Sequence, residues 1–404
     1  MVPAPCSFSE AGLFVSDRPV ELMAPPGRAG GSFARVLPFL IPYLVPLIVV
    51  ICYEYWGIRA FAIVSGVYLA APLFDLLLGR EKGARAPSPP RTRSESLFCR
   101  LALWFWAPTQ AAFVVWALVV VTREDLGALD CWALACSLGL TAGIVGITVA
   151  HELAHGSSWW DRLLAEVLPM LSSYPHFATE HIGGHHHDVG TATDSATARL
   201  GENLYAFLCR RIPGGVVCAC RLEARRLRLM GRRFWTTRNR FWRYGLQLLV
   251  VYLAVGFFFG VRGVLVFAAQ SLVAVFLLEA INYVQHYGLT RREVSAGRFE
   301  PIRPWHSWDS SHRFSNAISF NLGRHSDHHC RTERPYQDLR PCPEAPQLPA
   351  GYAAMAILAY FPPLWQRVID RRLAVWRQKN GLDPELNNDC KTAPHRAVPD
   401  RSSL

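Results

Sequence analysis

Long apolar runs separated by short polar turns are the dominant pattern of this chain. A helix needs about 20 apolar residues to cross a bilayer, and six runs approach or exceed that length. They occupy residues 33–53, 58–78, 97–121, 129–150, 244–261 and 263–283. We therefore predict an all-α membrane protein with six transmembrane helices, arranged as three helical hairpins.

The polar segments between the hairpins predict the orientation of the helices. The stretches 80–93 and 210–243 are rich in Arg, whereas the turns within the hairpins are short and nearly neutral. Because basic loops stay on the cytoplasmic side, we predict that both stretches and both termini are cytoplasmic. All 14 histidines follow the fourth or the sixth run. The same topology therefore places every His on the cytoplasmic side.

Two apolar stretches allow another interpretation. The last hairpin, 244–283, would also fit a buried helical pair of a soluble domain, although the four preceding runs argue for a bilayer. The stretch 351–364 is interrupted by Pro362 and Pro363. We expect this stretch to pack at the membrane interface rather than to cross the bilayer.

Composition and charge agree with a membrane protein. The chain has 404 residues, of which 51% are hydrophobic and 18% charged, so it is too apolar for an ordinary soluble enzyme. The net charge of +11 fits an anionic leaflet or an acidic protein partner, and no nucleic-acid-binding motif accompanies it. The 11 cysteines lack the CxxC spacing of zinc and iron-sulfur sites, so we expect reduced thiols.

We divide the chain into three parts. A polar leader, 1–32, precedes one membrane-embedded domain, 33–370, and a polar tail, 371–404, follows it. The leader contains no continuous apolar segment, so we expect no cleavable secretion signal.

Histidines are concentrated in motifs at the ends of the predicted spans. His151 and His155, in HELAH, lie one helical turn apart on one face. Alone, HExxH is the zinc protease signature, with Glu152 as general base. The motif HIGGHH then adds His181, His185 and His186.

The remaining ring nitrogens come from the end of the sixth run and from a cluster beyond it. His286 stands in NYVQHYGL, and His325, His328 and His329 stand in NLGRHSDHH, where helical spacing lets all three face one site. Together the motifs supply nine candidate metal ligands: His151, His155, His181, His185, His186, His286, His325, His328 and His329. Nine ligands are too many for one ion, so we predict two ions with four or five nitrogens each.

At this point the chain resembles a known family, the integral-membrane di-iron alkane and xylene monooxygenases, which are related to membrane fatty-acid desaturases. The resemblance rests on HELAH, EHIGGHHHDVGTATDSATARLGENLYAFL, NYVQHYGL, HSWDSSHRFSN and NLGRHSDHHCRTERPYQDLR, in this order, and covers about residues 40–370. It implies two iron ions held by the nine His and O2-dependent hydroxylation of an unactivated carbon of an alkane or alkylbenzene. It further implies a bacterial inner membrane.

The resemblance also implies how the reaction is driven. A high-valent di-iron oxo species would abstract hydrogen and return hydroxyl. Electrons would come from a rubredoxin or ferredoxin and its NAD(P)H-dependent reductase, and the donor must be a separate polypeptide because the chain has no CxxCG pair. One departure concerns Gln285, where alkane hydroxylases commonly have Glu and the xylene-type branch is closer to Gln. This departure weakens the case for linear alkanes in particular.

Two other functions stay open from the residues. A desaturase would use the same metals but remove a second hydrogen. A zinc-dependent intramembrane protease would use only His151, Glu152 and His155.

Several polar residues are candidates for orienting the ligands, because a metal-bound His usually donates its other ring nitrogen to an acceptor. They are Glu152, Glu180, Asp194, Glu279, Asn282, Asp309, His312, Asn321 and Asp327. Glu279 lies two helical turns before His286, so it is either an additional iron ligand or part of a salt bridge or helix cap. The basic stretch 221–243 either docks an acidic electron donor or contacts anionic lipid.

Overall fold

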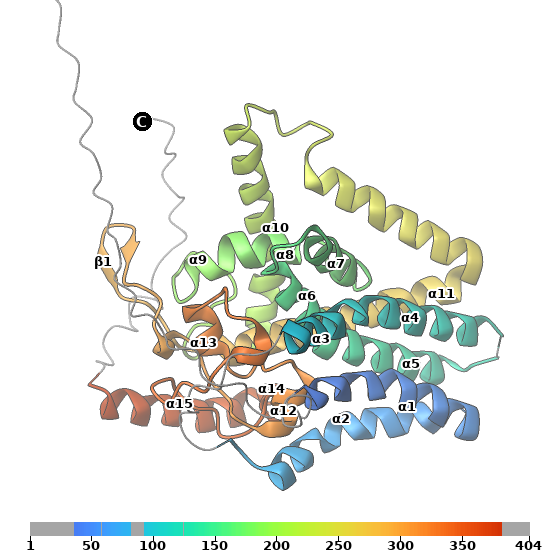
Figure 1. Cartoon of the computed structure of the whole chain (residues 1–404), viewed down its shortest axis with the longest axis horizontal. Helices are drawn as coiled ribbons and strands as arrows, with labels where there is room; N and C mark the ends of the chain where they lie inside the picture. Colours follow the sequence, from blue (N-terminus) through green and yellow to red (C-terminus); the bar gives the residue numbers. More distant parts are fainter. Residues whose placement is uncertain (1–35, 58, 82–92, 124, 382–404) are drawn as a thin grey trace, which may run out of the picture.

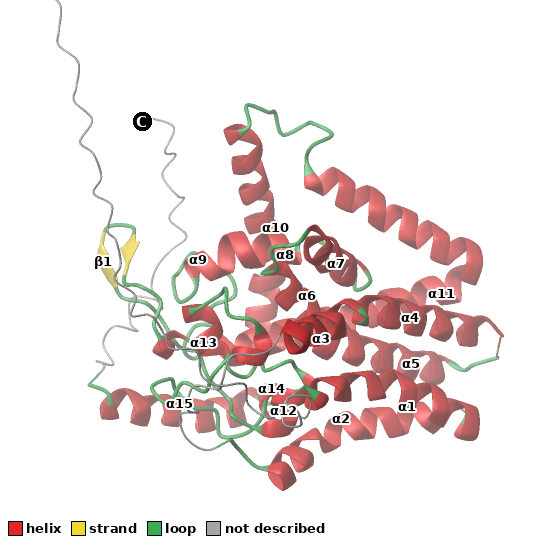
Figure 2. Cartoon of the chain, in the orientation of Figure 1, coloured by secondary structure: helices red, strands yellow, loops and turns green. Residues whose placement is uncertain are grey.

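The computed structural model describes residues 36–57, 59–81, 93–123 and 125–381, and most of them form helices (Figures 1 and 2). The predicted leader, most of the loop 80–93 and the end of the predicted tail lie outside the described residues. The first helices are α1 (Ile41–Trp56), α2 (Arg59–Leu78), α3 (Arg93–Trp104), α4 (Trp106–Arg123), α5 (Ala128–Thr141) and α6 (Ile147–Ala154). A π-helical turn, Ala142–Gly146, joins α5 to α6.

The second half of the chain adds shorter helices around two long ones. They are α7 (Trp159–Met170), α8 (Phe177–Glu180), α9 (His186–Asp188), α10 (Leu204–Leu229), α11 (Arg240–His286), α12 (Arg313–Ile318), α13 (His325–Cys330), α14 (Tyr352–Ala359) and α15 (Pro362–Lys379). A two-stranded antiparallel hairpin, β1 (Glu293–Ser295) with β2 (Arg298–Phe299), follows α11.

Among the described residues, four helical segments are long and apolar enough to cross a membrane. They are Leu37–Trp56, Ser94–Arg123, Ala128–Ala154 and Arg240–His286. The described apolar part of α2, Tyr68–Leu78, is shorter. The prediction of a helical membrane protein is therefore confirmed.

The longest segment, α11, is two helices merged across a sharp bend at Gly260. This residue has φ 63° and ψ −171°, a backbone conformation that only glycine adopts without strain. The sequence predicted the break two residues later, around Arg262. The bend turns the second half of α11 back toward the histidine clusters. This half of the helix ends at the candidate ligand His286.

Exposure distinguishes the outer helices from the central one. Only 33% of the most apolar window of Leu37–Trp56 is buried, against 78% of the window of Ala128–Ala154. Large apolar side chains on α1 and α11, such as Leu47 and Phe257, are exposed, as expected where lipid is the solvent. The central segment that carries His151 is thus enclosed by protein.

The shorter helices gather at one end of the bundle. Figure 1 shows α9, α13 and the β-hairpin at the left of the view, while α1, α4 and α5 extend to the right. Helix α12 is tied to α2 by Asp75. The Asp75 carboxylate accepts hydrogen bonds from the backbone N–H of Ser315 at 2.9 Å and from the Ser315 hydroxyl at 2.5 Å. Both partners are buried, so this contact fixes α12 on the end of α2.

The segment predicted to pack at the interface forms α14 and the start of α15. Pro362 and Pro363 occupy the first turn of α15, where proline costs nothing because that turn has no internal N–H partner to lose. Met355 of α14 and Ile369 of α15 are buried in one core cluster with Trp308. Helix α15 continues to Lys379 with Leu373 buried, so the domain boundary placed at 370 falls within this helix.

A close contact between α5 and α11 gives a stability prediction. A Cβ atom at Gly139 of α5 would lie 2.5 Å from Val273 Cβ and 2.6 Å from the Gln270 carbonyl oxygen of α11. We expect Gly139→Ala to lower the melting temperature of the detergent-purified protein, at a cost of about 1–3 kcal/mol, because overpacking forces the two helices apart. Gly245→Ala in α11 is the matched control, since nothing lies within 4 Å of that position. Equal stability of the two variants would contradict the close packing.

Candidate metal centre

The nine histidines singled out in the sequence lie together as two groups. The first group contains His151, His155, His181, His186 and His328, and the second contains His185, His286, His325 and His329. Within each group the candidate ligand nitrogens all lie within 4.8 Å of one another. The division into five and four nitrogens is what two neighbouring ions would require.

Ring nitrogens within each group point at one another. The Nε2 atoms of His181 and His186 are 2.9 Å apart, and those of His286 and His325 are 3.0 Å apart. A neutral imidazole has one N–H and one lone pair, so a convergent set of this size cannot satisfy every ring by hydrogen bonds alone. The Nε2 atoms of His151, His155 and His185 are buried without a hydrogen-bond partner in the described part of the chain. A cation in each group would satisfy them, so the donor set fits two metal ions.

A π-helical turn explains how the motif HIGGHH serves both groups. Residues His181–His185 form this turn between α8 and α9. Its wider winding, with i to i+5 hydrogen bonds, brings His186 rather than His185 beside His181. Four-residue spacing would place His181 and His185 on one face of a regular α-helix, but here the two rings belong to different groups.

Helix α13 is also shared between the groups. His325 and His329 are one turn apart and belong to the group of four, with their Nε2 atoms 3.0 Å apart. His328 instead approaches His186, with the two Nε2 atoms 3.2 Å apart. The expectation that all three would face one site is therefore only partly met, and α13 bridges the two groups.

Burial keeps the rings neutral. Desolvation lowers the pKa of His155 to about 4, and the nearby His185 acts in the same direction. The pKa values of His181, His325 and His329 lie well below 6.5, first because of burial and then because neighbouring imidazoles repel a second charge. A metal ligand must be unprotonated, so these rings are ready to bind metal at neutral pH.

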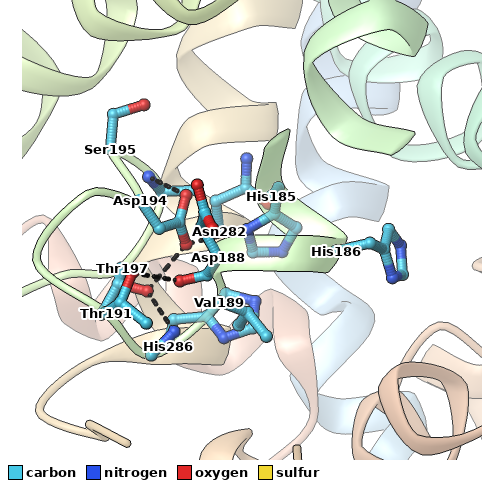
Figure 3. Close-up of polar contacts among 12 residues, drawn as sticks. His185, His186, Asp188, Val189, Thr191, Asp194, Ser195, Thr197, Asn282 and His286 are labelled. Carbon is cyan, nitrogen blue, oxygen red and sulfur yellow. Dashed lines mark hydrogen bonds and ion pairs between the residues drawn. The ribbon is translucent and has the colours of Figure 1, made fainter. Parts of the chain in front are cut away.

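Asp194 orients His185, as predicted for a residue behind the ligands. Its Oδ2 lies 3.0 Å from His185 Nδ1 and accepts a 2.7 Å hydrogen bond from the Thr197 hydroxyl (Figure 3). Its Oδ1 accepts the backbone N–H of Ala196 at 2.9 Å. Despite burial, the pKa of Asp194 is lowered, chiefly by His185. A carboxylate on Nδ1 directs the opposite nitrogen, Nε2, toward the other ligands.

A fully buried guanidinium, which the sequence analysis did not single out, joins two histidine-bearing elements. Arg211 of α10 donates to both carboxylate oxygens of Glu180, at 2.9 and 2.8 Å, and to Glu279 at 2.8 Å. Glu180 directly precedes the π-helical turn, and Glu279 lies two turns before His286 on α11. Tyr174 and Asn282 complete the network with hydrogen bonds to Glu279 of 2.9 and 2.8 Å.

The contacts of Glu279 distinguish between a role as an iron ligand and a role in a salt bridge or helix cap. Both of its oxygens are occupied by Arg211, Tyr174 and Asn282, and it belongs to neither group of candidate ligands. Of the two interpretations, the structure therefore shows the salt bridge. The only sequence signal for Arg211 was a charge in an Arg-rich stretch, which is also typical of an exposed loop.

Two aspartates position α13. Asp309 accepts the backbone N–H of Ser326 at 2.7 Å, and burial raises the pKa of Asp309 to about 7. Asp327, between His325 and His328, accepts two hydrogen bonds from Arg334, at 2.8 and 2.6 Å. Each carboxylate thus holds the backbone or an adjacent segment, and neither bonds to an imidazole.

The other candidates contact the polypeptide around the site. Glu152 accepts the Tyr336 backbone N–H at 2.9 Å, and Asn321 donates to the Tyr336 carbonyl at 2.9 Å. His312 lies between Arg80 and Ser310, with 2.9 Å contacts to each, and is in neither ligand group. The side chain of His187, which follows the ligand His186, is 84% exposed.

A largely apolar cavity of about 340 Å³ reaches both groups from within the helix bundle. Its walls come from α2, α5, α11, α12 and α14, and include Leu140, Ile144 and Leu277. At its inner end it meets His151 and His181 of the first group and His325 of the second. The cavity therefore brings an apolar molecule directly to the candidate metal ligands.

The ion network of Arg211 gives a second prediction. We expect Arg211→Met to destabilise the protein by about 3–5 kcal/mol, because two buried carboxylates lose their counter-charge. Adding Glu279→Gln removes one of those charges and should recover part of the loss, as measured by thermal unfolding in detergent. The neighbouring Arg210 is the control, since it pairs with Glu202 at a half-buried position. If Arg210→Met cost as much, the special role of Arg211 would be refuted.

Comparisons with known proteins agree with this geometry. The fatty acid desaturase family model matches residues 126–359. Alkane 1-monooxygenase 1 of Pseudomonas aeruginosa is 39% identical over 78% of this chain and 84% of its own length. Alkane 1-monooxygenase 1 of Alcanivorax borkumensis is 35% identical over 76% of each chain. The xylene/toluene monooxygenase hydroxylase component XylM of Pseudomonas putida is 28% identical over 83% of this chain and 89% of its own. The resemblance seen in the histidine motifs is thereby confirmed: the chain belongs to the alkane monooxygenase branch of the fatty acid desaturase family and is a membrane monooxygenase.

Proposed function

We propose that this protein hydroxylates a terminal or methyl C–H bond of a hydrophobic hydrocarbon, such as an alkane or an alkylbenzene. The observation that carries the proposal is the apolar cavity that ends on His151, His181 and His325. Such a cavity excludes charged and strongly polar substrates, since these would lose hydration without gaining partners. The names of the relatives, which act on alkanes and on xylene or toluene, support the same substrate class.

We further propose that the nine His hold two iron ions, five ligands on one and four on the other. When bound, iron supplies the activation of O2 that no side chain of this chain provides. Each turnover would consume the hydrocarbon, O2, two electrons and two protons, and release the alcohol and water. Neither group includes a Cys, Asp or Glu in the described part of the chain.

The chain's own residues have three tasks in this reaction. The cavity residues Leu140, Ile144 and Leu277 bind the hydrocarbon by contact and exclude water. Asp194 orients His185, and the Arg211 network holds the elements that carry His181 and His286 in register. Burial keeps the imidazoles neutral, so the ligand set does not have to lose protons before the metal binds.

The proposed topology has six crossings. It counts α2 with the four segments that are long and apolar enough to cross, and counts α11 as two helices on either side of Gly260. The histidine groups would lie in the cytoplasm of a bacterial cell, at the inner membrane, because Arg-rich loops of membrane proteins stay on the cytoplasmic side. Electrons would come from a separate rubredoxin or ferredoxin and its NAD(P)H-dependent reductase.

Contacts of Glu152 argue against the zinc protease alternative. A protease of this kind needs that carboxylate as a general base, whereas here it accepts the Tyr336 backbone N–H at 2.9 Å. A zinc protease would also leave most of the nine imidazoles without a role. The desaturase alternative uses the same site and differs only in its product.

The proposal predicts specific products and a specific metal. Membranes containing the protein, supplied with a rubredoxin, its reductase, NADH and O2, should convert members of a panel of alkanes and alkylbenzenes to alcohols. Gas chromatography with mass spectrometry identifies the product, and elemental analysis of the purified protein should find about two iron per chain. Alkene products would instead indicate a desaturase, and one zinc without iron would indicate the protease.

The shared helix α13 gives a variant test of the metal centre. We expect His328→Ala to lower bound iron and abolish alcohol formation, because the first group loses a ligand that also lies beside the second. His187→Ala is the matched control, because the His187 side chain is exposed and contacts the neighbouring Asp188. This variant should keep iron and activity. Full iron occupancy and full turnover in His328→Ala would show that the ligand set is wrong.

A further inference from the structure

Two Arg-rich surfaces in the described part of the chain differ in the residues that surround their arginines. One is the tip between α10 and α11, residues 229–239, within the stretch considered for either lipid or donor binding. The other lies at the end of α13. A soluble electron donor would dock on whichever of these two surfaces faces water.

The tip between α10 and α11 has the composition of a lipid-facing surface. Leu229 and Trp235 are 81% and 77% exposed, next to the exposed Arg232 and Arg233. Exposed aromatic and aliphatic side chains mixed with Arg are typical of a membrane interface. Figure 1 shows this tip at the top of the view, well away from α13.

The end of α13 brings the candidate ligands closest to a polar surface. His328 and His329 are buried, whereas the next two residues, Cys330 and Arg331, are exposed. The following segment, Thr332 to Gln337, forms one wall of a second, more polar cavity of about 390 Å³ that reaches His155. Both groups are therefore near this surface, the first through His155 and His328 and the second through His329.

Three exposed arginines surround the end of α13: Arg303, Arg331 and Arg340, which we call the arginine rim. Arg340 is fixed there by its backbone N–H, which donates to Asp327 at 2.8 Å. The segment after Arg303 is fixed by the Ser326 hydroxyl, which donates to the Ser307 carbonyl at 2.9 Å. Among residues 330–340, the exposed charged side chains are those of Arg331, Glu333 and Arg340. Positive charge is therefore in excess in this segment.

The rim lacks the apolar residues of the tip. Between Val294 and Phe361, the described chain has no large hydrophobic side chain that is exposed. A basic surface without exposed apolar groups suits a soluble, acidic partner, because charge complementarity guides encounter and orientation there.

We infer that the arginine rim is the docking surface for a small acidic electron-transfer protein, and that the tip between α10 and α11 contacts lipid headgroups instead. This inference rests on the proposed function, which requires an external electron donor. None of the three rim arginines lines the apolar cavity, so donor and hydrocarbon would approach the histidine groups along different surfaces.

Paired charge reversals test the docking surface by binding, without turnover. The full-length protein is placed in nanodiscs of neutral phosphatidylcholine, and the dissociation constant of a purified rubredoxin is measured at low ionic strength. Arg303→Glu/Arg340→Glu should raise this constant by about tenfold or more and reduce its salt dependence. Neither side chain belongs to the Asp327 ion pairs, so the metal content should stay unchanged.

The matched control is Arg232→Glu/Arg233→Glu at the tip, which makes the same change in net charge. It should leave the dissociation constant within about twofold. Unaltered binding by the rim variant, or weaker binding by the tip variant, would overturn the inference. Failure of the native protein to form an alcohol would count against the proposed function alone, because donor binding is measured separately.

Discussion

The buried ion network of Arg211 is the constraint on which the site depends. Nine neutral imidazoles attract one another only weakly, so the backbone elements that carry them must be held by other contacts. Arg211 joins Glu180, at the start of the π-helical turn, to Glu279, on the helix that ends at His286. The π-helical turn and the residue after it supply ligands to both groups, and α11 supplies His286 to the second. A single guanidinium thus holds His286 in position relative to the ligands of the turn.

The network also determines the electrostatic character of the centre. Three carboxylates near the histidines have cationic partners: Glu180 and Glu279 share Arg211, and Asp327 pairs with Arg334. Asp194 lies 3.0 Å from His185 Nδ1 and accepts hydrogen bonds from Thr197 and Ala196. No described carboxylate takes part in either ligand group. Low local dielectric makes an unpaired charge costly, so this arrangement lets an apolar cavity end directly on the ligands.

The sequence was sufficient to identify the nine histidines and the helical membrane fold, because both follow from local patterns. Dense HxxxH spacing and long apolar runs indicate metal ligands and membrane helices without reference to tertiary contacts. The division of the ligands into two groups could not be predicted in this way. His185 and His186 are adjacent in sequence, and a π-helical turn sends them to different groups. Regular α-helical periodicity cannot reveal such a turn.

Other features could not be predicted because they depend on long-range contacts. Arg211 follows Arg210 in a basic stretch, and only the tertiary structure distinguishes the buried guanidinium from the half-buried one. The roles of Glu279 and of the stretch 221–243 stayed open for the same reason. His312, grouped with the ligand-orienting candidates, instead contacts Arg80, which is far from it in sequence.

Gln285 connects the one departure from the alkane hydroxylase pattern to the shape of the site. Its amide lines the apolar cavity beside His286 and donates to the Tyr352 hydroxyl at 3.2 Å, while its backbone carbonyl accepts the Trp308 N–H at 2.9 Å. A glutamate there would place a charge on the wall of a largely apolar cavity, where loss of hydration is costly. The neutral amide instead ties α11 to α14, both of which line the cavity. Specificity within the hydrocarbons is therefore expected to depend on how α14 packs against α11, since that contact sets the width of the cavity next to the ligands.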